Sequence, residues 1–291
     1  MLVKDAMQAH AITTHPEASL VDAVTTMQTL QIGRLPVVKA GELVGLLTDG
    51  SVRRHLPALR EGLTPWAFTA RIGAIKVHQA MIRGVLTTRA DSPLGLAVHL
   101  MHDRGVGGLP VLDDSDQLAG ILTRTDVLWA AARWPRMQWD SLQQHMTTAP
   151  IVVSPSDLAS EAAAKIRITQ LKVLPVVEGE HLVGVLHARD LEAAIERAMA
   201  AHGDTVHGAH FFLAGKTVGD LMRAPLRYVL DSSPIPTVLQ KMLEAQVYGL
   251  PVLAETGQLL GVITVKDMLN AVMNVMSRSR PLGFDEIEAL S

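Results

Sequence analysis

The chain has 291 residues, of which 48% are hydrophobic and 19% are charged, and its formal net charge is −3. This is the composition of a folded globular protein, and the charge gives no indication of a nucleic-acid-binding surface. The chain has no cysteine, which excludes disulfides and thiolate metal sites. It has no long uncharged apolar run, and Met1–Asp5 has no apolar signal-peptide core, so we expect a cytoplasmic protein.

One pattern occurs four times along the chain, centred on the tripeptide Leu-Pro-Val. The prolines of these tripeptides are Pro36, Pro110, Pro175 and Pro251. Nine or ten residues after each proline, a glycine opens a short apolar strand; these glycines are Gly45, Gly120, Gly184 and Gly261. Self-similarity of this kind indicates that one supersecondary unit is used several times.

The elements of each copy follow in the same order. A short extended stretch comes first, at 11–13, 85–87, 151–153 and 228–230. An amphipathic helix follows, with apolar residues three or four positions apart, starting near Leu20, Leu94, Leu158 and Ile235. The Leu-Pro-Val strand, a polar turn, the glycine-led strand and a second helix complete the copy. Each copy therefore reads strand–helix–strand–turn–strand–helix.

Two irregular stretches interrupt this rhythm, at about 56–74 and 192–215. They separate the first copy from the second and the third from the fourth, whereas the junction at 129–142 is shorter. We therefore expect the first copy to pair with the second, and the third with the fourth.

The four copies resemble the CBS domain family. The resemblance rests on the Leu-Pro-Val strands, on a methionine that leads each copy, and on the closing pattern Gly-apolar-apolar-Thr-x-x-Asp. The leading methionines are Met7, Met81, Met146 and Met222. The resemblance implies an α+β fold of four CBS repeats (β-α-β-β-α), paired into two Bateman modules with small three-stranded sheets packed by helices. We place the repeats at 1–60, 75–135, 141–198 and 215–280, and the modules at 1–140 and 141–291.

The resemblance also implies a function. The family binds adenosine-containing ligands, namely AMP, ADP, ATP or S-adenosylmethionine, in clefts between paired repeats, and signals to a partner. We therefore expect a regulatory protein, not an enzyme, with no cofactor, although a magnesium ion could accompany the nucleotide. The alternative is a scaffold that assembles without ligand. A homodimer and an intrachain pseudo-dimer both remain open, and the effector protein is unknown.

The closing pattern differs among the copies. The second copy has Thr123 with Asp126, and the fourth has Thr264 with Asp267. The third copy keeps Asp190 but has His187 in place of threonine, and the first has Ser51 in place of aspartate. In the family the aspartate accepts hydrogen bonds from the ribose hydroxyls, which suits an acceptor-only group. The resemblance therefore favours the clefts at Asp126 and Asp267.

The resemblance also assigns further ligand contacts. The cleft at Asp126 would add Arg124 and, from the paired repeat, Ile12, Thr13 and Arg34; the cleft at Asp267 would add Lys266, Ile151, Val152 and Lys172; and the cleft at Asp190 would add Arg189, Arg227 and Tyr228. An ordinary alternative applies to all of them. A threonine and an aspartate at a helix start form a common N-terminal cap, and an exposed basic side chain needs no ligand.

A separate group of polar residues lies near the end of the second irregular stretch: His202, Asp204, His207 and His210. Imidazole and carboxylate groups can bind zinc, but this spacing matches no helix-face metal motif. We expect a polar loop there and no metal.

Overall fold

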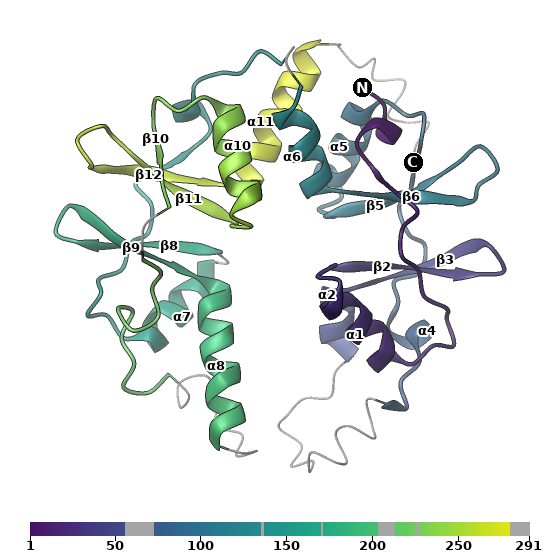
Figure 1. Ribbon diagram of the computed structural model, residues 1–291, viewed down its shortest axis with the longest axis horizontal. Coiled ribbons are helices and arrows are strands. Elements are labelled where there is room, and N and C mark those ends of the chain that lie inside the picture. Colours follow the sequence, from purple (N-terminus) through teal and green to yellow (C-terminus); the bar gives the residue numbers. More distant parts are fainter. Residues whose placement is uncertain (56–72, 135–136, 170, 203–212, 225–226, 280–291) are drawn as a thin grey trace. The chain divides into compact units, whose positions relative to one another are not determined.

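The computed structural model describes residues 1–55, 73–134, 137–169, 171–202, 213–224 and 227–279 (Figure 1). The chain divides into two compact units, which meet in the sequence between Ala130 and Ala131. The first unit holds the first two repeats and the second unit holds the last two. Each unit is described here by itself.

The first unit begins with a 3-10 helix, η1 (Val3–Asp5). The first repeat then contains β1 (Gln8–Ala9), α1 (Leu20–Thr29), β2 (Arg34–Lys39), β3 (Glu42–Thr48) and α2 (Asp49–His55). The second repeat contains α4 (Val77–Ala80), β4 (Thr88–Arg89), α5 (Leu94–Asp103), β5 (Gly108–Leu112), β6 (Leu118–Thr123) and α6 (Arg124–Ala132). In Figure 1 the hairpins β2–β3 and β5–β6 lie one above the other.

The second unit repeats this order. The third repeat contains η3 (Leu142–Gln144), β7 (Thr147–Thr148), α7 (Ala159–Thr169), β8 (Val173–Glu178), β9 (His181–His187) and α8 (Ala188–His202). The fourth contains β10 (Val229–Leu230), α10 (Ile235–Glu244), β11 (Gly249–Leu253), β12 (Leu259–Thr264) and α11 (Val265–Ser279). No described helix is both long and apolar enough to cross a bilayer.

Local capping and apolar spacing explain where α1 starts. The hydroxyl of Ser19 accepts a hydrogen bond from the amide of Val21 and so caps α1. From Leu20 onward the buried positions Leu20, Ala23 and Met27 fall on one face. The predicted helix starts agree with the structure to within one residue. The predicted strands at 11–13 and 85–87 are shifted, because parallel pairing occurs at Thr14 with Val37 in the first repeat and at Thr88 with Val111 in the second.

The leading segment of each repeat, which contains its methionine, crosses to the sheet of the paired repeat. β1 of the first repeat pairs with β6 of the second, and β7 of the third pairs with β12 of the fourth. Single bridges return the exchange, Leu46 with Ile82 and Val185 with Arg223. The pairing of repeats one with two and three with four is thus confirmed, as is the α+β fold class.

The number of strands per sheet differs from the expected three. The sheets of the second and fourth repeats have four strands, in the orders β1-β6-β5-β4 and β10-β11-β12-β7. Those of the first and third have two, β2-β3 and β8-β9. Two strands account for the difference. The crossing segment and the parallel strand, β1 with β4 and β7 with β10, each add an edge strand to the larger sheets, whereas the corresponding segments make only single bridges to the smaller ones.

The four repeated glycines make this crossing possible. A Cβ atom at Gly45 would lie 2.5 Å from the sulfur of Met81, and one at Gly261 would lie 2.5 Å from the carbonyl oxygen of Thr147. Gly120 is crowded by the carbonyl oxygen of Gln8, whereas Gly184, like Gly45, is crowded by the side chain of a leading methionine, here Met222. At Gly120 and Gly261 glycine is needed because a second backbone approaches this closely.

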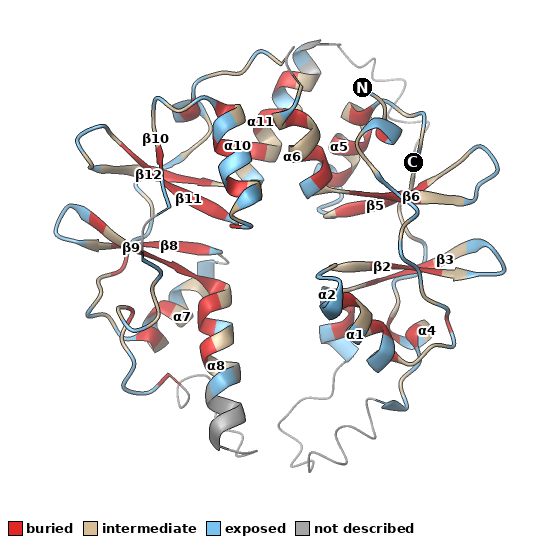
Figure 2. Ribbon diagram, viewed as in Figure 1, coloured by how far each residue is buried: buried red, intermediate tan, exposed pale blue. Residues whose placement is uncertain are grey.

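An apolar core packs between the hairpin and the helices of the third repeat and includes Leu174, Leu186 and Leu191. It also takes in Leu213 and Val218, from the segment that leads to the fourth repeat. A smaller cluster of Val173, Val185 and Val262 joins the sheets of the third and fourth repeats. Figure 2 shows that the central strands, such as β5 and β11, are buried, whereas the hairpin tips are exposed. The repeats of a pair are therefore joined by apolar contact as well as by strand exchange.

Candidate functional site

The second helix of every repeat begins with a side-chain cap, which is reciprocal in the first, second and fourth repeats and one-sided in the third. In the second repeat, Oδ2 of Asp126 accepts hydrogen bonds from the amide and the hydroxyl of Thr123, at 2.7 and 2.5 Å. In the fourth, Oδ2 of Asp267 accepts the same two bonds from Thr264, at 2.9 and 2.6 Å. The capping interpretation of these motifs is therefore correct, and it uses only one oxygen of each carboxylate. Any ribose contact depends on the other oxygen, Oδ1.

The Oδ1 atoms of the aspartates differ in what they contact. Oδ1 of Asp126 accepts a hydrogen bond of 2.9 Å from the side-chain amide of Gln8, which crosses from the first repeat. Asp126 is only 8% exposed. For Asp267, no described residue donates a hydrogen bond to Oδ1, and the residue is half-buried. Among the three aspartates, Asp267 is therefore the one whose Oδ1 has no hydrogen-bond donor among the described residues.

The residues predicted to join Asp267 in its cleft are exposed. The segment that carries Ile151 and Val152 runs from β7, in the sheet of the fourth repeat, to a bridge at Val153 in the third. Ile151 and Val152 are 42% and 37% exposed, unusual for aliphatic side chains between two sheets. Lys172 and Lys266 are exposed. The segment thus brings apolar surface to the boundary between the paired repeats.

The third repeat departs from the prediction. Oδ1 of Asp190 accepts a hydrogen bond of 2.8 Å from Nε of Arg223, and a second from the same guanidinium. Oδ2 accepts a bond of 3.2 Å from the amide of His187. The sequence reasoning placed Arg227 and Tyr228 opposite Asp190, but Arg223 occupies that position. The backbone of Arg223 bridges to Val185, and this pairing positions the Arg223 side chain beside the Asp190 carboxylate.

Arg227 and Tyr228 instead line a pocket of about 650 Å³ in the fourth repeat. The other walls include β10, Ser233 between β10 and α10, and Lys241 of α10. Arg189, which follows the third repeat's last strand, donates a hydrogen bond of 2.9 Å to the carbonyl oxygen of Gln246, just after α10. Of the residues predicted for the third cleft, Asp190 thus pairs with Arg223, Arg189 bonds to the backbone after α10, and Arg227 and Tyr228 line this pocket.

His187 replaces the threonine that the other three repeats have at this position. It is 4% exposed, and this burial lowers the pKa of its imidazole from 6.5 to about 4, although the nearby Asp190 carboxylate opposes the shift. Arg189 and Arg223 add to the lowering. Nδ1 has no hydrogen-bond partner among the described residues. His187 is therefore a neutral, buried ring at neutral pH.

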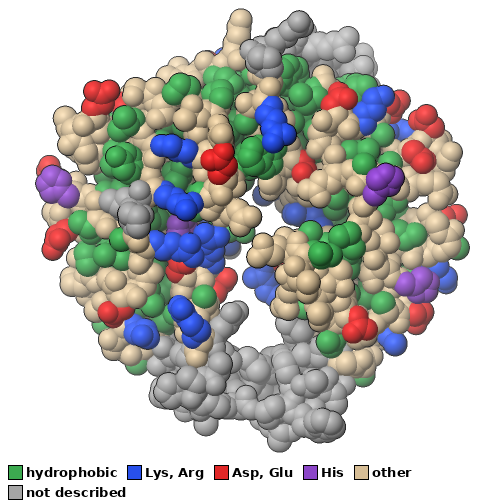
Figure 3. Space-filling model, in the orientation of Figure 1, with side chains coloured by type: hydrophobic (Ala, Val, Ile, Leu, Met, Phe, Trp, Pro, Cys, Tyr) green, Lys and Arg blue, Asp and Glu red, His purple; other side chains and the backbone are tan. Residues whose placement is uncertain are grey.

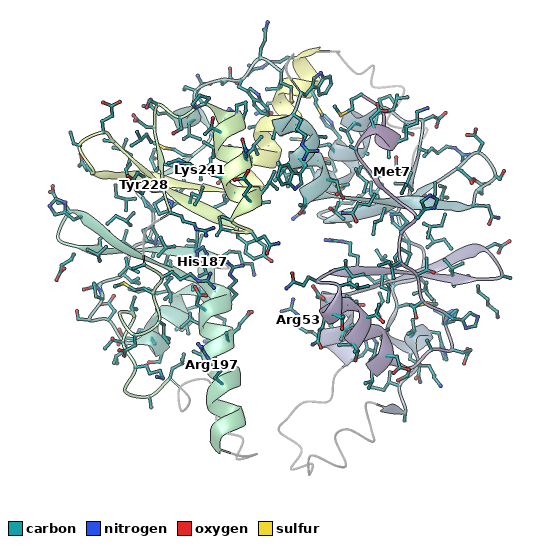
Figure 4. The ribbon with its side chains drawn as sticks, viewed as in Figure 1. Met7, Arg53, His187, Arg197, Tyr228 and Lys241 are labelled. Carbon is teal, nitrogen blue, oxygen red and sulfur yellow. The ribbon has the colours of Figure 1, made fainter. Side chains whose placement is uncertain are left out.

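Basic side chains gather on one face of the second unit. Figure 3 shows them over α10 and α8. In Figure 4, Lys241 lies on α10 and Arg197 lies on α8, with His187 between them where α8 begins. Lys241 and Arg197 are exposed. This face carries the positive charge that an anionic ligand or partner would require.

The first repeat lacks the carboxylate. Ser51 takes its place and completes the cap with Thr48. The amide of Thr48 donates a hydrogen bond of 2.9 Å to the serine hydroxyl. That hydroxyl donates to the carbonyl oxygen of Thr48, and Ser51 is 1% exposed. The neighbouring Asp49 is exposed and does not substitute for it. The first repeat therefore has a cap but no ribose anchor.

Arg34 and Lys172 are not equivalent, although the sequence reasoning gave them the same role. Arg34 begins β2 and its side chain lies over the second repeat, where a Cβ at Gly108 would be 3.1 Å from its Cδ. The corresponding residue in the third repeat is Val173, which lies against Gly249 in the same way. Ile12 and Thr13, also predicted for the cleft at Asp126, are exposed and precede Thr14, which bridges to Val37 of β2.

Sequence reasoning did not predict Gln8 or Arg223. Both directly follow the leading methionine of their repeat, and that shared position is a signal that the sequence contains. The polar group at 202–210 lies outside the described residues, apart from the backbone of His202 at the end of α8.

Comparison with known proteins identifies the family. The CBS domain matches residues 3–58, 75–133, 141–197 and 218–274, so the chain belongs to the CBS domain family. The uncharacterized protein MJ1225 of Methanocaldococcus jannaschii is 24% identical over 279 residues, which cover 92% of this chain and 97% of that protein. The resemblance drawn from the repeats is thereby confirmed.

Solved structures show the same fold. The crystal structure of MJ1225 has a TM-score of 0.67 at 22% identity and covers 93% of this chain and 99% of that one. An uncharacterized conserved protein from Pyrococcus horikoshii has a TM-score of 0.66 at 20% identity, with coverage of 94% of this chain and 100% of that one.

A relative by sequence is matched over only part of its length. Inosine-5'-monophosphate dehydrogenase of Thermoplasma acidophilum is 31% identical over 146 residues, but these are only 26% of that enzyme.

Proposed function

We propose that the chain is a regulatory protein that binds an adenosine-containing nucleotide between its paired repeats and passes the bound state to a partner protein. The ligand class is AMP, ADP, ATP or S-adenosylmethionine. The observation that carries the proposal is the Asp267 carboxylate, which holds its cap with one oxygen and keeps the other without a described donor. A ribose diol has the two donors that such an acceptor can use.

The neighbourhood of Asp267 supports an adenosine ligand in particular. A purine needs apolar faces, and Ile151 and Val152 supply exposed aliphatic surface between the two sheets. A phosphate needs a cation, and Lys172 and Lys266 are exposed side chains on segments that meet at this boundary. In this proposal Asp267 anchors the ribose, Ile151 and Val152 cover the base, and the lysines bind phosphate.

Regulation requires that the ligand bind one arrangement of the repeats more tightly than another. The ligand would contact the fourth repeat through Asp267 and the third through its leading segment. It would therefore stabilise one spacing of the two sheets, and a partner could recognise that spacing. Catalysis has no place in this proposal.

The test is isothermal titration calorimetry of the full chain with AMP, ADP, ATP and S-adenosylmethionine. Asp267→Asn removes the charge and is expected to weaken binding at the fourth repeat at least tenfold. The chain offers a matched control in Asp220, which caps Thr217 with bonds of 2.8 and 3.1 Å but lies outside the clefts. Asp220→Asn removes the same kind of cap and is expected to leave the affinity unchanged.

A ligand-independent scaffold is the second candidate. The observation that favours it is that Ser51 and the Asp190–Arg223 pair leave two of the four repeats without an accessible carboxylate. If none of the four compounds binds, or if Asp267→Asn and Asp220→Asn behave alike, the sensor proposal is wrong and the scaffold is favoured.

A further inference from the structure

We propose that the residue after the leading methionine of each repeat is a gate that decides whether the carboxylate of the paired repeat can take a ribose. This inference rests on the proposed function and adds to it the residues that set the selectivity of each cleft. The four gate residues are Gln8, Ile82, Thr147 and Arg223.

The four positions are structurally equivalent. Each gate residue is opposite one residue of the paired repeat's glycine-led strand: Gln8 opposite Ile121, Ile82 opposite Leu46, Thr147 opposite Val262, and Arg223 opposite Val185. In each case that opposite residue stands five positions before the last residue of the closing motif, which is Asp126, Ser51, Asp267 or Asp190. The same backbone geometry therefore presents four different side chains to one place.

The consequences follow from side-chain chemistry. Gln8 reaches Oδ1 of Asp126 with a neutral amide, and Arg223 reaches Oδ1 of Asp190 with a cation. Threonine is too short to span the same gap, and no described residue reaches Oδ1 of Asp267. Ile82 has no polar group, and the closing motif of its paired repeat ends in Ser51, whose hydroxyl is satisfied within its own cap.

The gates imply a graded series of affinities. At Asp267 a ribose diol can bond to Oδ1 without displacing a hydrogen bond from any described residue. At Asp126 it must displace a neutral hydrogen bond, which we expect to weaken binding about tenfold. At Asp190 it must displace a charged pair whose carboxylate is only 9% exposed, which we expect to weaken binding about a hundredfold. The first repeat is expected to bind no ribose.

A reciprocal exchange tests the gate. Arg223→Thr is expected to open the third cleft and add one AMP equivalent that is lost again in the double variant with Asp190→Asn. Thr147→Arg is expected to close the fourth cleft and weaken its binding about a hundredfold. The measurement is the number of AMP sites and their affinities by titration calorimetry of the full chain, with thermal melting to check that each variant is folded.

Two matched controls separate the gate from the added or removed charge. Thr148 neighbours Thr147 in β7, where successive side chains point to opposite faces, so Thr148→Arg adds the same charge away from Asp267. Arg167 is exposed on α7, and Arg167→Thr removes an arginine from the same unit. Both controls are expected to bind AMP as the original chain does.

The outcomes distinguish the two proposals. If the original chain binds AMP but Arg223→Thr lowers or preserves the number of sites, Arg223 serves the ligand or only the fold, and the gate is wrong. An unchanged affinity in Thr147→Arg would likewise overturn it. If neither the original chain nor Arg223→Thr binds AMP, ATP or S-adenosylmethionine, the proposed function fails and the gate fails with it.

Discussion

A Cβ atom at Gly261 would lie 2.5 Å from the carbonyl oxygen of Thr147. The nearest neighbour of Gly261 in β12 is therefore a backbone atom of the crossing strand β7, and not a side-chain atom. Gly120 has the same relationship to the carbonyl oxygen of Gln8. Because a carbonyl within a strand pair has little room to move, we expect Gly120→Ala to lower the free energy of unfolding by about 1–3 kcal/mol.

The control for this prediction lies in the same unit. A Cβ at Gly50, in α2, would have its nearest neighbours 3.9 Å away. Gly50→Ala is therefore expected to be neutral, or to stabilise by up to about 1 kcal/mol, because alanine favours a helix. Urea denaturation of both variants measures the difference, and equal stabilities would show that the crossing of β1 does not require glycine.

The buried His187 predicts a pH dependence of stability. Its pKa is lowered from 6.5 to about 4 by burial, so between these values the unfolded chain binds more protons than the folded chain. Stability therefore falls as the pH is lowered through this window, by about 3 kcal/mol in total at about 1.4 kcal/mol per pKa unit. The measurement is the urea midpoint at several values from pH 7 to pH 4.

His187→Thr is the matched variant, since threonine stands at this position in the other three repeats. It is expected to flatten the profile relative to the original chain, leaving only the contributions of the remaining histidines and carboxylates. Parallel profiles for the two proteins would contradict the neutral, buried state of the ring.

Loss of the ion pair between Asp190 and Arg223 should lower stability more than loss of the neutral hydrogen bond between Asp126 and Gln8. Asp190 is buried and Arg223 is about half exposed, so Arg223→Met leaves a buried carboxylate with fewer donors. We expect a loss of about 1–2 kcal/mol after allowing for the solvent that reaches the guanidinium. Gln8→Met removes only a neutral bond from Asp126 and is expected to cost about 1 kcal/mol or less. Equal losses in chemical denaturation would argue against a charge effect.

The core of the third repeat gives a test of the packing. Leu174 is fully buried in that core, and Leu174→Ala should lower the free energy of unfolding by about 3 kcal/mol. Ile168, at 76% exposed, is a suitable comparison, and Ile168→Ala should change stability by no more than about 0.5 kcal/mol. Thermal melting that fails to separate the two variants would place Leu174 outside the core.

The repeated motifs made much of the fold predictable. Leu-Pro-Val and the closing glycine recur in register, and both are local features that a single sequence displays. The crossing segments were not predicted, because β1 and β7 have only two residues each and their partners lie in another repeat. A strand so short leaves no periodic pattern.

The site was predictable in part for the same reason. The caps at Asp126 and Asp267 are local and were found, whereas the contact of Asp190 with Arg223 joins residues 33 positions apart. The different positions of Arg34 and Lys172 could have been recognised from the sequence. Arg34 immediately precedes Leu35, but Lys172 is two residues before Leu174, so counting from the tripeptide selects Val173.

The exchange of leading segments between paired repeats limits how this chain can be divided. A repeat cut out alone would expose the backbone groups that its neighbour's segment covers, for example those of β6 where β1 lies. Unpaired strand edges of this kind recruit other chains, so an isolated repeat would aggregate or swap segments with a second molecule. The smallest fragment expected to fold by itself is therefore a pair of repeats. A truncated or fused version of this protein must keep the leading segments of both repeats.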